Sequence, residues 1–349
     1  MPNILVTGGA GFIGSHTCLA LLERGYNIEI IDSFINSNPI SIDRILEISD
    51  LKKSQNRINV VQSDLRNIEK LRKIFKDAKQ KGNPIEGVIH FAGLKSVNES
   101  VKNPILYWDN NLISSINLIK IMDENDCRTL VFSSSATVYG LSGKYLINEN
   151  EKLEPINPYG NTKYVIEKLM HDIYNNSKSD WSIANLRYFN PIGAHVSGLI
   201  GENPIGLPNN VFPMILQVAA RKIPELKIYG RDWPTKDGTG VSYYIHVMDL
   251  ADGHVLTMEH LLENSGNILD INLGTGVGTS VLELVNTFKK INKIEVPYSF
   301  SERRNGDVSR VVADNSFGCS ILNWDPIRSI EDMCRDGWNW KVLNPDGFI

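Results

Sequence analysis

The chain has 349 residues, with 36 Lys and Arg against 40 Asp and Glu, which leaves a formal net charge of −4 at pH 7. A single hydrophobic core rarely grows beyond about 250 to 300 residues, so this length predicts two domains. The hydrophobic fraction of 42% is that of a globular protein and excludes disordered, collagen-like and coiled-coil chains. The charge balance gives no overall field that would attract nucleic acid or an anionic membrane.

Cysteine usage and hydropathy bear on the cellular compartment. The four cysteines stand singly, with neither a C-x-x-C pair nor the dense spacing of a disulfide scaffold or a zinc site. We see no basic segment followed by a long apolar run near the first residue, and no run of about 18 apolar residues. We therefore expect a reduced, cytoplasmic protein that binds neither membrane nor nucleic acid. The histidines show no ligand spacing, so no metal is expected.

Short apolar strands alternate with longer helical patterns through the first half of the chain. The predicted strands occupy residues 4–6, 28–31, 60–61, 88–91, 130–132 and 183–186. This alternation is typical of βαβ units and a parallel sheet. Consecutive apolar residues within each strand indicate that helices cover both faces. We predict an α/β fold with a doubly wound parallel sheet, a Rossmann domain, over residues 1–190.

The amino-acid composition of the chain changes after this region. Glycine, proline and asparagine are frequent from residue 191 to 213, and further elements are predicted at 211–220, 226–229, 249–262 and 281–290. These patterns predict a second, smaller α/β domain over residues 191–349, interleaved with the first. Segment 274–278 (GTGVG) precedes a helix, but we interpret it as a flexible turn and not as a second dinucleotide site.

A glycine-rich loop follows the first predicted strand and opens the first predicted helix. Gly8 would permit the tight turn, Gly11 would let the backbone approach a pyrophosphate, and Gly14 would let helix and strand pack closely. The alternative is an ordinary turn between a strand and a helix. The combination of strand, three spaced glycines and helix favours a dinucleotide site.

Two aspartates follow later strands of the same domain. Asp32 lies about 20 residues beyond the loop, where an acid accepts hydrogen bonds from the adenosine ribose. Its charge would repel a 2′-phosphate, so NAD is preferred to NADP. Asp64 is placed to meet the adenine or, equally well, to cap the helix predicted from residue 67 to 78. The small residues of segment 91–93 would leave room for the cofactor.

A tyrosine and a lysine begin a later helix. Tyr159 and Lys163 are spaced i,i+4 and project from one face. A tyrosine pKa near 10 must fall to about 7 for a useful base. The Lys163 ammonium and a positive nicotinamide ring can share that effect. Ser135, at the carboxyl end of the fifth strand, could bridge the phenol and a substrate hydroxyl.

With these motifs in view, the chain resembles UDP-glucose 4-epimerases of the extended short-chain dehydrogenase/reductase superfamily. The resemblance runs from residue 3 to about 347 and is carried by segments 7–16 (TGGAGFIGSH), 90–95 (HFAGLK), 132–140 (FSSSATVYG), 187–195 (RYFNPIGAH) and 244–251 (YIHVMDLA). It implies an NAD-dependent isomerase of galactose metabolism, which oxidises the sugar at C4, turns the 4-keto sugar over and reduces it again.

The resemblance also implies which residues form the site. Catalysis is expected from Tyr159, Lys163 and Ser135. The expected NAD-binding residues are Gly8, Gly11, Phe12, Ile13, Gly14, Asp32, Asn36, Asp64, Leu65, Phe91, Ala92, Gly93, Lys95, Asn110, Ser133, Tyr159, Lys163 and Tyr188. The expected UDP-sugar-binding residues are Lys95, Ser135, Thr137, Tyr159, Asn190, Asn210, Val211, Tyr229, Arg304, Asp307 and Val311.

Two positions depart from the family pattern. Ser242 and Tyr243 stand where the family usually carries Arg-Asp, and the arginine contacts the diphosphate. We expect an affinity for UDP-sugars about tenfold or more lower, because a charged hydrogen bond contributes about 1.5–3 kcal/mol, unless Arg303 or Arg310 substitutes. Val311 stands where relatives can hold a bulky aromatic residue, and the extra space suggests turnover of UDP-N-acetylhexosamines.

Alternative functions and the quaternary state were also weighed. A nucleotide-sugar 4,6-dehydratase needs an acid pair where this chain has Ala136 and Thr137, and an NAD sensor could discard the Tyr-Lys pair. The resemblance implies a homodimer through helices at 104–124 and 159–174, which Ile113, Ile116, Leu169 and Ile173 permit. Trp338 and Trp340 are expected to bury against a helix around residues 331–335.

Overall fold

The computed structural model describes residues 1–50, 55–141, 146–176, 180–206, 208, 210–303, 309–310 and 312–349. Its centre is a seven-stranded sheet with the order β11-β7-β5-β4-β1-β2-β3, in which every neighbouring pair is parallel. The strands are β1 (Asn3–Thr7), β2 (Asn27–Asp32), β3 (Ile58–Gln62), β4 (Ile85–His90), β5 (Thr129–Ser133), β7 (Ser182–Tyr188) and β11 (Ile268–Leu273). The doubly wound sheet predicted from the sequence is confirmed.

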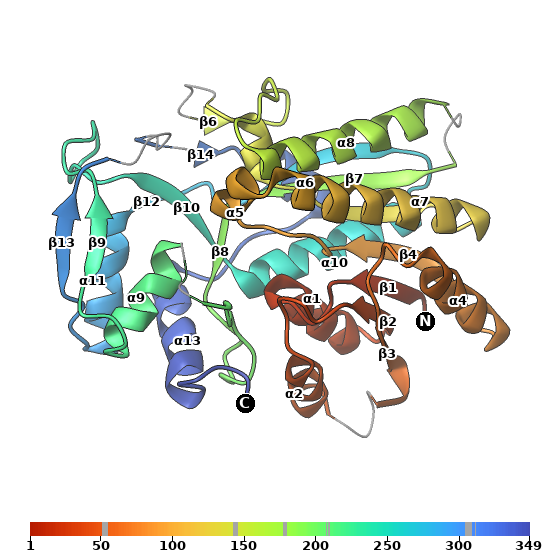
Figure 1. Ribbon diagram of the computed structural model, residues 1–349, viewed down its shortest axis with the longest axis horizontal. Helices are drawn as coiled ribbons and strands as arrows, with labels where there is room; N and C mark the ends of the chain where they lie inside the picture. Colours follow the sequence, from red (N-terminus) through yellow and green to blue (C-terminus); the bar gives the residue numbers. More distant parts are fainter. Residues whose placement is uncertain are drawn as a thin grey trace.

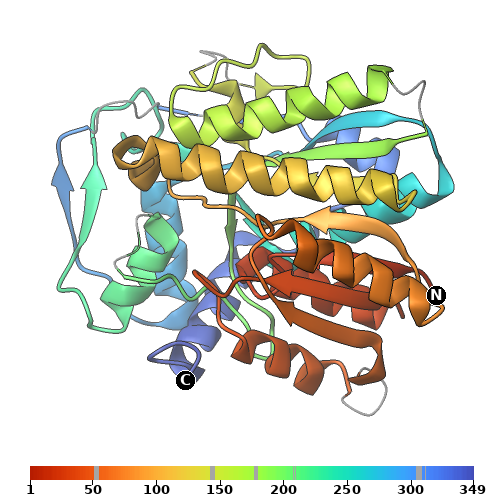
Figure 2. The same cartoon turned by 45° about the vertical axis from the view of Figure 1, so that its right-hand side comes forward.

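Helices cover both faces of this sheet, which explains why its strands are apolar at consecutive positions. One face packs on α1 (Phe12–Glu23), α2 (Ile40–Ile48), α10 (Val247–Glu263) and α12 (Ser316–Leu322). The other face packs on α4 (Ile68–Gln80), α7 (Ser114–Glu124) and α8 (Pro158–Asn176), which lie side by side in Figures 1 and 2. The described helices include none that is long and apolar enough to cross a membrane.

Shorter elements shape the carboxyl edge of the sheet. Between β4 and α7 the chain forms α5 (Val97–Lys102), α6 (Pro104–Tyr107) and a π-helical turn, η2 (Trp108–Ile113). The remaining short elements of this part are η1 (Gln55–Arg57), η3 (Ala136–Tyr139), β6 (Leu146–Ile147) and β14 (Val312–Ala313), of which the last two pair in parallel. Of these, η1 directly precedes β3 and so lies at the amino edge of the sheet, whereas η3 directly follows β5 at its carboxyl edge.

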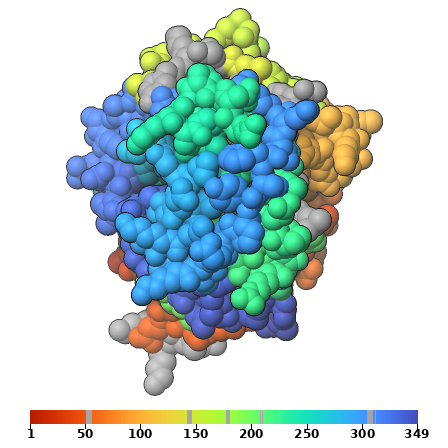
Figure 3. All heavy atoms as spheres, turned by 90° about the vertical axis from the view of Figure 1, so that its left-hand side faces the viewer, coloured from red at the N-terminus to blue at the C-terminus, as the bar shows by residue number. Residues whose placement is uncertain are grey.

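A smaller group of elements lies beside the edge of the sheet. It contains β8 (Asn190–Ile192), α9 (Val211–Ala219), β9 (Leu226–Tyr229), β10 (Val241–His246), β12 (Gly278–Ser280), α11 (Val281–Asn292), β13 (Tyr298–Ser301) and α13 (Ile330–Leu343). They form a three-stranded sheet β12-β10-β8, a two-stranded sheet β13-β9 and a separate apolar core. Viewed from this end, the surface is mainly green to blue, the colours of the second half of the chain (Figure 3).

The second half of the chain also returns to the large sheet. β11 extends the sheet beyond β7, and α10 packs on α1. The two tryptophans expected to pack on a helix near residue 335 belong to that helix themselves. Trp338 and Trp340 lie within α13, where Trp338 meets Phe288 of α11 and Trp340 meets Phe348. Trp340 is buried and Trp338 packs partly on the core as expected, but the expected partner helix was wrong, because α13 extends through both tryptophans.

Candidate active site

The glycine-rich loop joins β1 to α1 at the point where the strand order reverses, between β1 and β4. Gly8 has φ +69°, and a Cβ there would lie 2.8 Å from the Ala92 amide nitrogen. A Cβ on Gly14 would lie 2.2 Å from the Gly8 carbonyl oxygen. Gly11 caps α1 without a side-chain hydrogen bond, so the first amides of the helix remain available to an anion. The loop therefore suits the pyrophosphate of a dinucleotide.

Asp32 ends β2 beside this loop and is buried. Its carboxylate accepts hydrogen bonds from the amides of Ala10 (3.0 Å) and Phe34 (2.9 Å) and from the Ser37 hydroxyl (2.7 Å). A carboxylate has about four acceptor positions, so one remains for a ribose hydroxyl. The same side chain thus fixes the glycine loop and offers negative charge at the adenosine end. Asn36 lies exposed in the loop that follows.

The capping alternative for Asp64 is wrong. Asn67 is the N-cap of α4, and its side chain accepts a hydrogen bond from the Lys70 amide. Asp64 lies in the preceding turn, and its carboxylate is bound by the backbone amide and guanidinium of Arg66, which lowers the pKa of the carboxyl. Leu65 beside it is buried. Contact between this turn and an adenine remains a prediction.

The loop after β4 is fixed by an asparagine that sequence analysis missed. Asn111, in η2, accepts a hydrogen bond from the Leu94 amide (2.8 Å) and donates to the Leu94 carbonyl (3.1 Å) and to the Thr162 hydroxyl (3.1 Å). It therefore holds segment 91–95 against α8. Phe91 stacks on His254, with ring centroids 4.7 Å apart. The neighbouring Asn110, which was predicted to bind NAD, is half-buried, whereas Asn111 is buried.

Three serines follow one another at the end of β5, and each has a different partner. Ser133 bonds the Tyr188 hydroxyl, and Ser134 donates to the carboxylate of Glu167. The Ser135 hydroxyl accepts from the amide (3.2 Å) and the hydroxyl (3.0 Å) of Thr137. All three serines are nearly inaccessible to solvent. The strand end is therefore rigid, and it brings Ser133, Ser135, Thr137 and Tyr188 together as predicted for neighbours in the site.

Helix α8 supplies the tyrosine and the lysine. Asn157 caps it by accepting a hydrogen bond from the Gly160 amide (2.8 Å), and Pro158 occupies the first turn. Lys163 is buried, donates to the Ser133 carbonyl oxygen (2.6 Å) and lies 5.9 Å from the centroid of the Tyr159 ring. Tyr159 is also buried, with Ser135 as its side-chain partner. The predicted catalytic triad is thus assembled at one strand end.

The expected fall in the tyrosine pKa is not present in the protein alone. Burial raises the pKa of Tyr159 above its ordinary value, and the Ser135 hydrogen bond counteracts only part of this effect. Burial also lowers the pKa of Lys163 to about 8. Loss of solvent is the largest cause at both residues, because a dry site disfavours the charged form of each. Further positive charge is needed to favour the phenolate.

A cavity of about 170 Å³ lies among the elements of the smaller group, between β8, α9, β10 and the start of α11. It is lined by Asn190, Pro191, Ile192, Glu202, Asn210, Val211, Phe212, Pro213, Ser242, Tyr244 and Val281. Asn210 begins α9 without using its side chain as a cap, and Asn190 donates to the Tyr243 carbonyl (3.2 Å). Three predicted substrate-binding residues are therefore brought together, and they share this cavity with the divergent Ser242.

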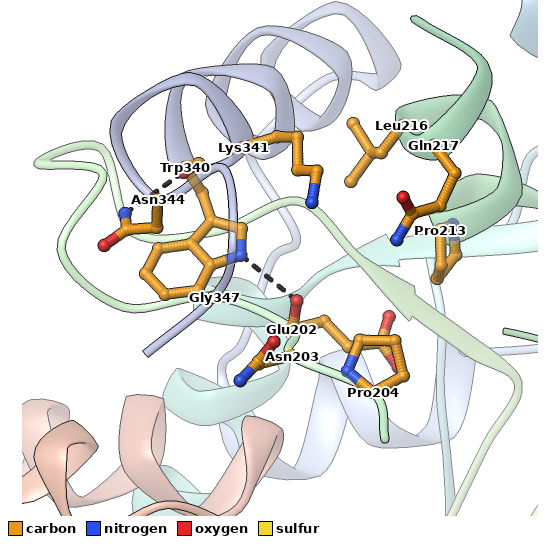
Figure 4. Close-up of a pocket in the computed structure, with 10 residues that line it drawn as sticks. All are labelled: Glu202, Asn203, Pro204, Pro213, Leu216, Gln217, Trp340, Lys341, Asn344 and Gly347. Atoms are coloured by element: carbon orange, nitrogen blue, oxygen red, sulfur yellow. Dashed lines mark hydrogen bonds between the residues drawn. The ribbon is translucent and has the colours of Figure 1, made fainter. Parts of the chain in front are cut away.

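A second pocket of about 40 Å³ adjoins this cavity and shares Glu202 and Pro213 with it. Figure 4 shows the Trp340 indole from the end of α13 directed toward Glu202, to whose carbonyl oxygen it donates a hydrogen bond (3.1 Å), while Asn344 donates to the Trp340 carbonyl oxygen (3.1 Å). A volume of this size holds only a water or two. We interpret it as a small space left by the packing of α13 against the wall of the larger cavity.

Other residues that were predicted to bind the substrate are not among the described residues that line this cavity. Tyr229 is 39% exposed on β9, and the described residues that line the cavity do not include it. Lys95 is exposed and pairs with Glu202 at 3.4 Å, across the gap between the two groups of elements. Arg304, Asp307 and Val311 lie outside the described residues. Among the residues that the structure describes, no group of three or more His, Cys, Asp or Glu could hold a metal ion.

The fold and this arrangement define a class of protein. A glycine loop at the reversal point of a parallel sheet, beside a buried Ser-Tyr-Lys group, is the site of a dinucleotide-dependent enzyme of the short-chain dehydrogenase/reductase type. A sequence profile of the GDP-mannose 4,6 dehydratase family matches residues 5–337.

More specific likeness comes from individual proteins. The chain is 48% identical over 348 residues to a bifunctional UDP-glucose 4-epimerase and UDP-xylose 4-epimerase of Pisum sativum, covering 99% of this chain and 97% of the relative. It is 46% identical to UDP-glucose 4-epimerase of Bacillus subtilis, covering 99% and 98%. The chain belongs to the UDP-glucose 4-epimerase family.

Solved structures agree with this assignment. UDP-glucose 4-epimerase of Stenotrophomonas maltophila, crystallised with NAD and formylated UDP-arabinopyranose, has a TM-score of 0.93 and 42% identity, covering 99% of both chains. The enzyme of Bifidobacterium longum, in complex with NAD⁺ and UDP, has a TM-score of 0.91 and 41% identity, covering 99% of both chains.

Proposed function

We propose that this protein interconverts UDP-glucose and UDP-galactose at C4 and uses NAD as its cofactor. The observation that carries the proposal is the buried group of Ser135, Tyr159 and Lys163 at the carboxyl edge of the sheet, next to the glycine loop. The family to which the chain belongs supports the reaction. The uncapped start of α1 and the close approach at Gly14 fit a pyrophosphate, and Asp32 fits an unphosphorylated ribose.

The residues of this chain have distinct tasks in that reaction. A bound NAD would supply a ring that takes a hydride from C4 of the sugar and returns it to the opposite face. Tyr159 takes the proton of the sugar 4-hydroxyl at its phenolic oxygen and gives it back after the sugar has turned. Ser135 bridges the two oxygens, and Lys163 favours the phenolate by its charge.

Epimerisation also requires that the sugar be held loosely while the nucleotide is held firmly. The cavity beside α9 offers Asn190, Asn210 and Val211 to the uridine diphosphate. Binding energy from this remote part of the substrate can position C4 without gripping the hexose. Tyr229, Arg304 and Asp307 remain proposed members of the same site.

The residues of η3 argue against the dehydratase reaction named by the matching family profile. Dehydration of a nucleotide sugar requires an acid pair to remove a proton from C5 and the hydroxyl from C6 as water, and this chain has Ala136 and Thr137 there. Thr137 uses its hydroxyl to bond Ser135. A sensor that binds NAD without chemistry would have no need of the buried Tyr159 and Lys163.

The test is to incubate the purified protein with UDP-galactose, without added NAD, and to measure UDP-glucose. We expect turnover by the wild type and a loss of at least about a hundredfold in Tyr159→Phe, because a general base typically contributes 10²–10⁴-fold. Tyr164→Phe, on the same helix, is the matched control and should remain active. An inactive wild type that retains NAD, or an active Tyr159→Phe, would contradict the proposal.

A second substrate class follows from Val311. A valine leaves more space beside the C2 substituent than an aromatic residue at this position would, so we infer some turnover of UDP-N-acetylgalactosamine. Support comes from a more distant relative, the UDP-Glc/GlcNAc 4-epimerase of Campylobacter jejuni, which is 29% identical. We expect Val311→Tyr to reduce this activity and spare that on UDP-galactose. A wild type that consumes only UDP-galactose would refute the inference.

We further propose a cytoplasmic homodimer. The four cysteines are free, which suits a reducing compartment. Near the start of α7, the apolar side chains of Val101, Ile105, Leu106 and Ile113 are exposed by 62%, 82%, 41% and 40%. Ile116 is half-buried, and Leu169 and Ile173 pack partly on the protomer's own core. A second copy would cover the exposed set.

A further inference from the structure

The proposed catalytic pair is the first half of a longer row of polar side chains on α8. Tyr159, Lys163, Glu167 and His171 follow one another at i,i+4 spacing, which places them along one helix face. The first three are buried, whereas 38% of the His171 side chain is exposed. Helix α8 contacts β7 and lies above it in Figures 1 and 2. The proposed reaction gives no task to the second half of this row.

Glu167 joins the row to the strand end that carries the serines. Its carboxylate accepts hydrogen bonds from Nε (3.0 Å) and Nη2 (2.7 Å) of Arg187, which is itself 1% exposed. It also accepts the Ser134 hydroxyl. Ser134 stands between Ser133, whose carbonyl holds the Lys163 ammonium, and Ser135, which faces Tyr159. One carboxylate therefore supports both partners of the tyrosine.

The buried group around Arg187 contains more carboxylates than guanidinium groups. Arg187 binds the Asp270 carboxylate (3.0 Å) in addition to Glu167, so two carboxylates share one guanidinium. The excess negative charge can be offset by the Lys163 ammonium beside Glu167 and by a protonated His171 beside Asp270. Burial favours the neutral amine, and Glu167 opposes that effect. The negative charge of Glu167 therefore acts to raise the pKa of Lys163.

The titratable groups packed beside Lys163, namely His90, Tyr159 and Tyr188, carry no charge in the protein alone. His90 on β4 is held neutral, since burial and Lys163 lower its pKa to about 3. Burial raises the pKa of both Tyr159 and Tyr188, so these phenols are uncharged in the protein alone.

Three more titratable groups lie near Arg187. Burial raises the pKa of Tyr139 to about 12, so its phenol stays protonated, and its oxygen accepts a hydrogen bond from Arg187 (3.1 Å). Glu149 meets Arg187 through its carbonyl oxygen (3.2 Å), and burial raises the pKa of its carboxyl. His171 bonds Asp270 (3.2 Å), which raises the pKa of the histidine. These groups face Arg187 and Asp270, one step further from Lys163.

We propose that Glu167 is a positioning residue for the epimerase reaction. It keeps Lys163 in its ammonium form beside Tyr159 and, through Ser134, holds the strand end that presents Ser135. The role rests on the proposed function, because Lys163 matters only if Tyr159 exchanges a proton with the substrate. Loss of the Glu167 charge should therefore make Lys163 lose its proton at lower pH.

The experiment titrates the lysine directly in the full chain as purified. Nuclear magnetic resonance of protein with ¹⁵N-labelled lysine side chains follows Lys163 from pH 6 to 11, and Lys163→Arg assigns its signal. We expect Glu167→Gln to lower the titration midpoint by about one pH unit or more, since i,i+4 neighbours on a helix have Cβ atoms about 5–6 Å apart and an opposite charge at short range has an effect of this size. The alkaline limb of kcat for UDP-galactose should move by the same amount, with KM changed less than twofold.

Two further variants separate charge from structure. Glu167→Asp keeps the charge and should restore the wild-type midpoint, and it carries the test if Glu167→Gln does not fold. Asp270→Asn removes the other carboxylate from Arg187 and should move the midpoint by less than half as much. An unchanged midpoint in Glu167→Gln, an equal shift in Asp270→Asn, or a one-unit shift in Glu167→Asp would overturn the role. An inactive wild type with a normal Glu167 effect would instead refute the proposed function.

Discussion

Ser242 places a neutral hydroxyl on the wall of the cavity that we propose for the uridine diphosphate. Of the two arginines that could compensate, Arg303 already bonds Asp232 through Nε (2.9 Å) and lies over the Trp233 ring at 3.9 Å. Drawing it toward a phosphate would break both contacts. These contacts make Arg303 a poor substitute, whereas Arg310 pairs with Val241 beside Ser242 and remains the candidate that could replace the missing phosphate contact.

We predict that Ser242→Arg tightens the binding of UDP by about tenfold, because a charged hydrogen bond contributes about 1.5–3 kcal/mol. Isothermal titration calorimetry with UDP measures the change. Ser320→Arg adds the same charge on α12, which packs on β11, and should leave the affinity as it is. Equal dissociation constants for wild type and Ser242→Arg would refute the prediction.

At the residue scale, the sequence could identify side chains with a spacing rule but not those defined by burial. Tyr159 and Lys163 were found because i,i+4 spacing is visible in a sequence, and the same rule extended by one turn would have found Glu167. Asn111 carries no such signal, since only the fold shows that it binds Leu94 and Thr162. Asp64 was ambiguous because two polar residues competed for one helix start.

The loop between β1 and α1 is the element on which cofactor binding depends. The Cβ of Gly14→Ala would lie 2.2 Å from the Gly8 carbonyl oxygen and 2.9 Å from the Gly9 Cα, both backbone atoms that cannot turn away. Helix α1 would have to move out from the strand. We expect a loss of about 1–3 kcal/mol in the free energy of unfolding, as for overpacked cores, and loss of the bound dinucleotide.

The measurement is the NAD content of the protein after gel filtration, together with denaturant unfolding. Gly274→Ala is the matched control, because its Cβ would find its nearest neighbour, Ala313, at 3.9 Å. It belongs to the segment that we interpret as a turn, so NAD content should not change. Retention of NAD by Gly14→Ala would show that the loop is not the pyrophosphate site.

At the element scale, pattern and position were predictable to different degrees. Six strands of the large sheet were visible as short apolar runs, and a helical pattern followed most of them. The seventh, β11, was missed because Asp270 and Asn272 interrupt its apolar pattern with side chains that bind His171 and Tyr139 inside the fold. A strand whose polar residues are satisfied by distant partners has no local signature.

The division of the whole molecule at residue 190 remains a prediction about domains. The chain crosses between the two groups of elements more than once, since α10 and β11 return to the large sheet after β8, β9 and β10 have been formed. The pair of Lys95 and Glu202 spans the same gap. Connectivity of this kind depends on which surfaces meet in three dimensions, and local composition does not reveal it.

The proposed dimer is expected to form at the surface near α7. Ile105 is 82% exposed on α6 and lies close in sequence to Val101 and Ile113, which are also exposed. Clusters of exposed apolar side chains mark interaction sites, and α7 and α8 beside this cluster are long enough to pack against their copies as a four-helix bundle. We predict that Ile105→Glu converts a dimer to a monomer, because burying an unpaired charge costs more than the contact gains.

Sedimentation equilibrium at micromolar concentration measures the assembly. Ile327→Glu is the matched control, since Ile327 is 75% exposed beside Arg328, which binds Asp249 of α10 on the opposite face of the large sheet. This variant should remain a dimer. A wild type that sediments as a single chain would refute the dimer itself, whereas a dimeric Ile105→Glu would move the interface away from α6 and α7. Because α8 carries Tyr159 and Lys163 on its buried face, a monomer that keeps its activity would show that the bundle does not hold the site together.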